Sequence, residues 1–102
     1  ILDIDAHHGN GTQCLLYAEP TLVCSLHGDP SDGFFPVYWG FEEERGAAEG
    51  DGFNLNLPLP RRCGDDLYLR SLDRALIAID EYRPDYLVLS LGLDFLAGDP
   101  YG

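Results

Sequence analysis

The side chains that could do chemistry gather near the start of the chain, where an apolar strand over residues 1–4 runs into acidic and imidazole groups. Residues two apart in an extended chain point to the same face, so Asp3, Asp5 and His7 share one side of the strand and His8 points to the other. Unpaired carboxylates are too costly to bury, and a bound cation is the least costly way to satisfy them. Glycines follow at once and allow a tight turn. The pattern predicts a metal site at the end of this strand.

A third metal ligand is expected from a later strand, residues 86–91, which is almost entirely apolar and leads into Asp94. In parallel α/β sheets, ligands gather at the carboxyl ends of the strands, so Asp94 should join Asp5 and His7. Two carboxylates and one imidazole leave an open coordination position, as catalytic zinc sites do, and iron(II) or cobalt(II) would accept the same ligands. Zinc bound there would lower the pKa of a water molecule to about 7 and polarise a carbonyl group, which is hydrolytic chemistry.

Each of these residues also has an ordinary structural explanation. A single aspartate after a strand usually forms a turn or caps a helix, and adjacent histidines often only pack and hydrogen-bond. The alternation of acidic and imidazole groups beside glycines is harder to explain in that way, although we interpret His8 as structural. Asp3 lies deeper on the strand, where it could orient an imidazole or hold a second, hard cation with Ser25 of the next strand.

A parallel sheet flanked by helices is the scaffold that the sequence pattern predicts for these residues. Apolar and alternating stretches predict strands over residues 1–4, 21–26, 53–59 and 86–91, and helices over residues 12–18 and from a cap at Asp65 or Asp66 to Tyr82. A helix between two such strands implies a right-handed parallel crossover, so the fold class is α/β. Pro58 and Pro60 confine the third strand to the end or edge of the sheet. The stripe that should pack the second helix on the core is Leu69, Leu72, Ala75, Leu76 and Ile79.

The composition of this 102-residue chain, whose formal net charge is −12, restricts the classes of molecule that it could bind. This charge argues against nucleic acid or an anionic membrane as the direct partner and suits a small cationic substrate, although acidic surfaces are often simply solvated. No stretch has transmembrane length. The three cysteines lack metal or redox spacing, and we expect a cytoplasmic protein.

Residues 28–52 form a long loop rich in Gly, Pro and Glu that also carries aromatic residues between 34 and 41. Such a loop should line a site, although its aromatic residues could merely pin it to the body or form contacts between copies of the chain in a homo-oligomer. Both ends of the chain fall within stretches that we interpret as functional. We therefore expect residues 1–102 to be the central part of one larger domain, since such a cut leaves open sheet edges.

Three motifs together resemble the histone deacetylase superfamily: Asp3-Ile-Asp5-Ala-His7-His8-Gly-Asn10-Gly, Ser25-Leu-His27 and Gly92-Leu-Asp94-Phe-Leu-Ala-Gly-Asp-Pro100. The surrounding stretches are most similar to bacterial acetylpolyamine amidohydrolases and histone deacetylase-like amidohydrolases. The resemblance spans essentially the whole chain. It implies a three-layer arginase-deacetylase fold, of which residues 1–102 would be the central fragment of the catalytic domain. It also implies zinc-dependent hydrolysis of an acetylated amine, either an acetylpolyamine or an acetyl-lysine-like group, to acetate and a free amine.

The resemblance also implies roles for individual residues. Asp5, His7 and Asp94 match the zinc ligands. Asp3 matches the carboxylate that supports the first catalytic histidine and touches a structural potassium ion. The other potassium ligands would be Asp5, the His7 carbonyl, Ser25 and the Leu26 carbonyl.

Two further matches concern the substrate side of the site. Asn10 matches the partner of the second catalytic histidine and, because some relatives carry Asp there, should bias that imidazole less towards its charged form. Phe35 matches the aromatic wall of the substrate tunnel. The family's catalytic histidine pair would lie upstream of Ile1, and its transition-state tyrosine downstream of Gly102.

Other functions fit the sequence less well. A member of the same fold that has lost catalysis could serve as a binding or structural module. An arginase-type ureohydrolase is opposed by Gly9, where arginases carry a further Asp for a second metal. A dinucleotide-binding domain is opposed because Gly9-Asn-Gly11 lacks the third glycine at the right spacing.

Overall fold

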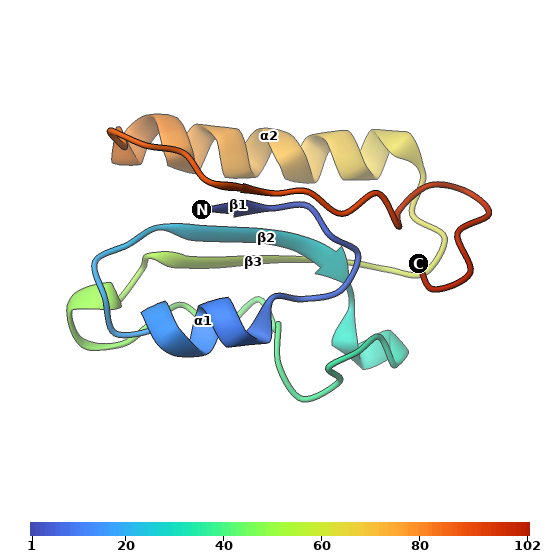
Figure 1. Ribbon diagram of the computed structural model, residues 1–102, viewed down its shortest axis with the longest axis horizontal. Coiled ribbons are helices and arrows are strands. Elements are labelled where there is room, and N and C mark those ends of the chain that lie inside the picture. Colours follow the sequence, from blue (N-terminus) through green and yellow to red (C-terminus); the bar gives the residue numbers. More distant parts are fainter.

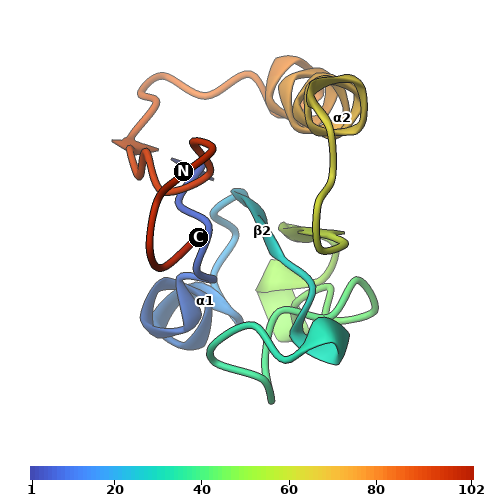
Figure 2. The ribbon, with the colours of Figure 1, turned by 90° about the vertical axis from the view of Figure 1, so that its right-hand side faces the viewer.

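A computed structural model describes residues 1–102 as a parallel sheet between two helices. The elements are β1 (Leu2–Asp3), α1 (Asn10–Leu16), β2 (Val23–Gly28), β3 (Asn54–Leu59), α2 (Asp65–Tyr82) and β4 (Leu89–Ser90), with 3₁₀ turns at Pro30–Asp32 and Ala48–Gly50. All strand pairs are parallel, in the order β3-β2-β1-β4. Helix α2 covers one face of the sheet, and α1 with the loop after β2 covers the other (Figures 1 and 2). This confirms the predicted three-layer α/β architecture. Neither helix is both long and apolar enough to cross a bilayer.

The apolar face of the sheet packs on α2. Its core contains Leu2 of β1, Cys24 and Leu26 of β2, and Leu57 of β3, all with 6% exposure or less, against the fully buried Ala75 of the helix. Strand β3 lies at an edge of the sheet, as its prolines predicted. The side chains of α2 that pack on this face recur every three to four residues, because such residues lie on one side of a helix.

The predicted stripe of α2 was wrong at two positions, because Leu69 is 54% exposed and Leu76 is 45% exposed. Each follows a core-facing residue, Tyr68 or Ala75, by one position, which rotates the side chain by about 100° away from the sheet. The predicted aspartate cap was also wrong. The N-cap is Gly64, and Asp65 is already helical and makes no capping bond.

The predicted last strand is much shorter than expected. Only Leu89–Ser90 is paired, although residues 86–91 were expected to be an apolar strand. All six residues are exposed, among them Leu89 at 50% and Tyr86 at 89%. Strand β4 lies at the edge of the sheet, where only β1 pairs with it, and residues 86–91 lie outside the core that packs on α2.

The opposite face of the sheet is polar. The register pairs Asp3 of β1 with Ser25 of β2 and Ser90 of β4, and pairs Ser25 with Asn56 of β3. Parallel partners in register point to the same face, so one row across the four strands carries only polar side chains. Strand β2 therefore has one apolar and one polar side, and Ser25 and His27 face the polar layer.

Gln13 of α1 is the centre of this polar layer and is 1% exposed. Its Oε1 accepts hydrogen bonds from Asn54 Nδ2 at 3.0 Å and Asn56 Nδ2 at 2.9 Å, and it lies 3.0 Å from His8 Nε2. Its Nε2 donates to Glu44 Oε2 at 2.7 Å. The network joins α1, β3 and the long loop, because polar groups buried between them must find partners in one another.

Gly40 fixes the loop to the same layer. Its N–H donates to Glu44 Oε2 at 2.9 Å, and its carbonyl lies 2.9 Å from His27 Nε2. Its φ is +97°, and a Cβ there would lie 2.7 Å from His27 Nε2 and 3.0 Å from His8 Cγ. Only glycine fits this close approach of the backbone to two imidazole rings.

Replacing Gln13 with Ala should lower the free energy of unfolding by about 3 kcal/mol, because the buried donors of His8, Asn54 and Asn56 lose their acceptor. Urea unfolding followed by circular dichroism measures this loss. The control is Cys14→Ala on the adjacent, exposed position of α1, which should change stability by less than about 0.5 kcal/mol. Equal effects of the two substitutions would contradict the central position of Gln13.

The three thiols should react with iodoacetamide in the order of their exposure. Cys14 is exposed and should be labelled first at neutral pH, whereas Cys24 is fully buried. Burial raises the pKa of Cys24 to about 11, so the reactive thiolate is scarce as well as inaccessible. Mass spectrometry of the native and urea-treated protein measures the order. Labelling of native Cys24 at the rate of Cys14 would contradict the packing of β2.

Candidate metal centre

Three potential metal ligands converge at the carboxyl ends of β1 and β4. One ligand atom each of Asp5, His7 and Asp94 lies within 4.8 Å of the others. His7 Nδ1 is 2.8 Å from Asp94 Oδ2 and 3.4 Å from Asp5 Oδ1. The pairing of β1 with β4 therefore brings together residues that are 87 positions apart in the sequence.

The backbone holds the carboxylates of this cluster in place. Ala6 N–H donates to Asp94 Oδ1 at 2.9 Å, and His7 N–H donates to Asp5 Oδ1 at 2.8 Å. Burial alone would raise the pKa of Asp94, but the hydrogen bonds from Ala6 and His7 outweigh it and hold that pKa below its usual value. Gly92 is required beside them, because a Cβ there would come within 2.6 Å of three Asp5 atoms.

The donor set fits a zinc ion. Ligand atoms in a tetrahedral zinc site lie about 2.0–2.2 Å from the ion and therefore about 3.3 Å from one another. The separations of 2.8 and 3.4 Å between His7 Nδ1 and the two carboxylates are close to that spacing. The three residues are half-buried. Iron(II) and cobalt(II) would accept the same donors.

Asp3 is a buried carboxylate without a basic partner. It is 6% exposed, and the ion pairs of the structure involve only His7 and Arg74 as bases. Burial raises its pKa, an effect that the 3.1 Å hydrogen bond from Asp5 N–H and the Ser90 side chain partly offset. A carboxylate in this environment fits a bound cation or a hydrogen-bond donor from further chain.

The other residues expected at a potassium site lie beside Asp3. Ser25 is its partner in the register and is 3% exposed. The side chain of Leu26 points into the apolar core, so only its backbone carbonyl could contact a cation on the polar face. Ser90 was missed by the sequence analysis, although a single hydroxyl in an apolar strand was a usable signal.

Asn10 and Phe35 are less closely tied to the cluster. Asn10 is the first residue of α1 and only half-buried. Phe35 is 65% exposed, whereas the Phe34 ring lies 6.5 Å from the His7 ring and beneath the Arg61 guanidinium at 5.0 Å. The sequence analysis assigned Phe35 among the aromatic residues between 34 and 41 but could not show that Phe34 would lie beside His7. The roles expected of Asn10 and Phe35 stay predictions.

His8 takes no part in the cluster, as expected. It is 4% exposed, bonds to Gln13 through Nε2 and stacks on His27 with ring centroids 4.5 Å apart. Its Nδ1 is the one buried side-chain polar atom without a partner.

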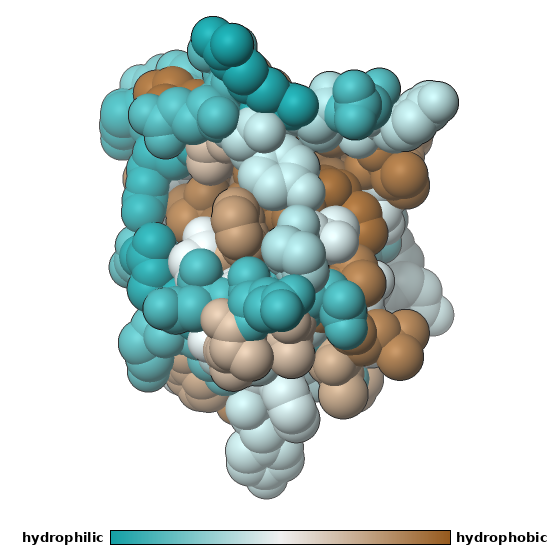
Figure 3. Space-filling view, turned by 90° about the vertical axis from the view of Figure 1, so that its left-hand side faces the viewer, coloured by the Kyte–Doolittle hydropathy of each residue, from teal (hydrophilic) through white to brown (hydrophobic).

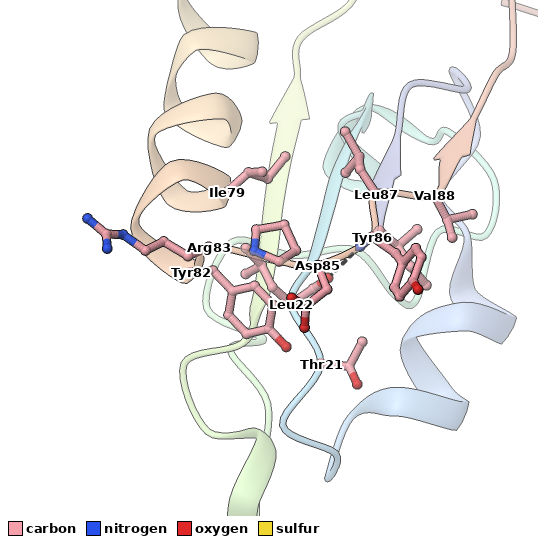
Figure 4. Close-up of a pocket in the computed structure, with 11 residues that line it drawn as sticks. Thr21, Leu22, Ile79, Tyr82, Arg83, Asp85, Tyr86, Leu87 and Val88 are labelled. Atoms are coloured by element: carbon pink, nitrogen blue, oxygen red, sulfur yellow. Dashed lines mark hydrogen bonds between the residues drawn. The ribbon is translucent and has the colours of Figure 1, made fainter.

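Two of the four cavities of the structure lie at opposite ends of the sheet. One, of about 540 Å³, adjoins the metal cluster through Ala6 and is lined by Phe34, Arg61 and Phe95 among others. The other, of about 500 Å³, is walled by the end of α2, the segment leading to β4 and the residues before β2 (Figure 4). Figure 3 looks onto that second end, where apolar residues reach the surface between hydrophilic ones. No cluster of potential metal ligands lies there, so the first cavity is the candidate substrate site.

Comparison with known proteins agrees with this geometry. The histone deacetylase domain family matches residues 1–102. The chain is 46% identical over 101 residues to the acetylpolyamine amidohydrolase of Burkholderia pseudomallei, covering 98% of the chain and 29% of that protein. It is 41% identical over 102 residues to the histone deacetylase-like amidohydrolase of Pseudomonas aeruginosa, covering 98% of the chain and 26% of that protein.

Solved structures show the same relationship. The crystal structure of the Burkholderia pseudomallei acetylpolyamine aminohydrolase superimposes with a TM-score of 0.95 at 46% identity, over 98% of this chain and 29% of that one. The crystal structure of a histone deacetylase homologue from Aquifex aeolicus superimposes with a TM-score of 0.90 at 40% identity, over 96% of this chain and 27% of that one. The chain thus spans less than a third of the length of these relatives. Because the family match covers every residue and the fold agrees, the chain belongs to the histone deacetylase family.

Proposed function

We propose that the full-length protein carrying this chain is a zinc-dependent amidohydrolase that removes the acetyl group from a small acetylated amine, either an acetylpolyamine or an acetyl-lysine-like group. The observation that carries the proposal is the convergence of Asp5, His7 and Asp94. It is supported by relatives named acetylpolyamine amidohydrolase and histone deacetylase-like amidohydrolase. We place the protein in the cytoplasm.

In this proposal Asp5, His7 and Asp94 hold zinc, which when bound supplies Lewis-acid polarisation of the acetyl carbonyl and a lowered pKa for water. His7 must offer the Nδ1 lone pair, because only an unprotonated nitrogen can be a ligand. The Ala6 N–H leaves Asp94 one free oxygen for the metal by occupying the other. This arrangement fixes the ligand directions before the substrate enters.

The remaining assigned residues support the same reaction. Asp3 and Asn10 would orient the two catalytic histidines, and Phe35 would form a wall against the acyl chain. A structural potassium ion would be held by Asp3, Asp5, the His7 carbonyl, Ser25 and the Leu26 carbonyl. This second cation would neutralise the buried Asp3, which has no basic partner among the ion pairs.

A single catalytic metal is favoured over an arginase-type pair. Arginases carry a second-metal Asp at the position of Gly9, and here a Cβ would lie 2.7 Å from Asp3 Oδ2. No ligand-bearing side chain fits there unless Asp3 moves. The site is therefore built for one transition metal.

The substrate should be a small cationic amine. The cavity beside the cluster is lined by Phe34 and Phe95, and its two aspartates, Asp65 and Asp99, are balanced by Arg61 and Arg62, so the preference for a cation rests on the net charge of the chain, −12. The negative field of the whole chain would attract a polyamine, whereas nucleic acid and anionic membranes would be repelled. Exposed aromatic residues such as Tyr38, at 82%, could form contacts between copies of the protein.

Asp94→Ala in the full-length, zinc-loaded protein should reduce release of acetate from acetylpolyamines and acetyl-lysine peptides by at least about 100-fold. The loss should exceed the effect of an outer-shell residue, because a ligand itself is removed. Calorimetric titration with zinc should find one tight site in the parent protein and none in the variant. The control is Asp85→Ala, an exposed carboxylate after α2. Retained turnover, or two tight sites in the parent, would contradict the assignment.

The 102-residue chain by itself should release no acetate, because the histidine pair and tyrosine of the family lie outside it in our assignment. Circular dichroism would first establish that the isolated chain is folded, and the full-length protein at the same zinc concentration is the control. Zinc-dependent turnover by the isolated chain would show that its own residues suffice for catalysis.

A further inference from the structure

His27 on β2 is fully buried but is not one of the metal ligands assigned above. Its Nε2 lies 2.9 Å from the Gly40 carbonyl oxygen, and its Nδ1 lies 2.8 Å from Ser25 Oγ. A carbonyl oxygen can only accept a hydrogen bond, so Nε2 must carry the proton. Nδ1 of the neutral ring is then an acceptor, and the Ser25 hydroxyl must donate its hydrogen to it.

The direction of this hydroxyl matters because Ser25 lies next to Asp3. The two residues are partners in the register of β1 and β2, and their side chains share the polar face of the sheet. With its hydrogen committed to His27, Ser25 Oγ has only lone pairs left for its other neighbours. A lone pair beside the buried Asp3 carboxylate is unfavourable unless a donor or a cation lies between them.

We propose that His27 is a positioning residue that turns the Ser25 hydroxyl so that its oxygen, and not its hydrogen, faces a potassium ion held beside Asp3. This inference rests on the potassium site of the proposed function. The Gly40 carbonyl selects the tautomer of His27 that makes this possible. The loop that carries Gly40 is thereby coupled to the cation site through one imidazole ring.

A purely structural role for His27 makes a different prediction. The ring also stacks on His8 with centroids 4.5 Å apart, so any smaller side chain would disturb the packing of the polar layer. The substitutions His27→Asn and His27→Gln distinguish positioning of Ser25 from packing alone, because each new side chain reproduces only one of the two hydrogen bonds of the imidazole. The Asn Oδ1 atom can occupy the position of Nδ1 and accept from Ser25. The Gln Nε2 atom can occupy the position of the ring Nε2 and donate to Gly40.

The test is the potassium dependence of the thermal unfolding midpoint of the full-length protein, with tetramethylammonium chloride keeping the ionic strength constant. His27→Gln should raise the potassium concentration for half-maximal stabilisation by about tenfold, the effect expected for one hydrogen bond. His27→Asn should leave it within about twofold of the parent value. Ser25→Ala should weaken potassium binding to a similar degree, and adding His27→Gln to Ser25→Ala should weaken it no further.

Three results would overturn the proposal: a parent protein that potassium does not stabilise, equal effects of Asn and Gln, or additive effects of Ser25→Ala and His27→Gln. Equal effects would show that His27 acts by packing alone. The failure of this proposal is separable from failure of the proposed function, which is decided by zinc binding and deacetylation in the Asp94→Ala comparison. A half-maximal potassium concentration about tenfold higher in His27→Gln, with a near-parent value in His27→Asn, would establish the positioning role.

Discussion

The parallel pairing of β1 with β4 is the interaction on which the candidate metal centre depends. Backbone bonds from Leu2 N to Val88 O at 2.9 Å and from Ile4 N to Ser90 O at 3.0 Å set the register. Beyond the last of them, the Ala6 N–H bonds to the Asp94 side chain, so the ladder continues with a carboxylate in place of a carbonyl. A slip of one residue would turn every side chain to the opposite face and separate Asp94 from His7.

The two faces of the sheet contribute in different ways. The face against α2 is an ordinary apolar core, which stabilises the sheet without specifying the loops. The face against α1 buries Gln13, Asn54 and Asn56, which are useful only when each finds its hydrogen-bond partner. This requirement holds the long loop in one arrangement, because Glu44 and Gly40 supply several of the partners. The polar layer therefore links the order of the loop to the geometry behind the metal centre.

The metal motif and the helices could be predicted from the sequence because their signals are local. The spacing of Asp5 and His7 depends on strand geometry alone. Helix α2 could be predicted from the period of its apolar residues. The polar layer could not be predicted, since the alternation around Asn54 and Asn56 equally fits side chains facing solvent. Its burial depends on a loop that is distant in sequence. The exposure of Tyr86 likewise depends on which strand forms the edge of the sheet. The proximity of Phe34 to His7 depends on the path of the long loop.

Of the three proposed metal ligands, Asp94 has the position that the sheet secures least. Asp5 and His7 follow β1, which is paired on both sides, whereas Asp94 follows the edge strand β4. The residues leading into β4 expose their apolar side chains, and an exposed edge of this kind favours pairing or covering by further chain. Any segment that covers β4 would restrict Asp94 as well as stabilise the sheet. In the proposed metal centre, where His7 Nδ1 would be a ligand and could not donate to Asp94, only the Ala6 N–H would hold this carboxylate, so metal affinity would be coupled to the covering of the edge strand.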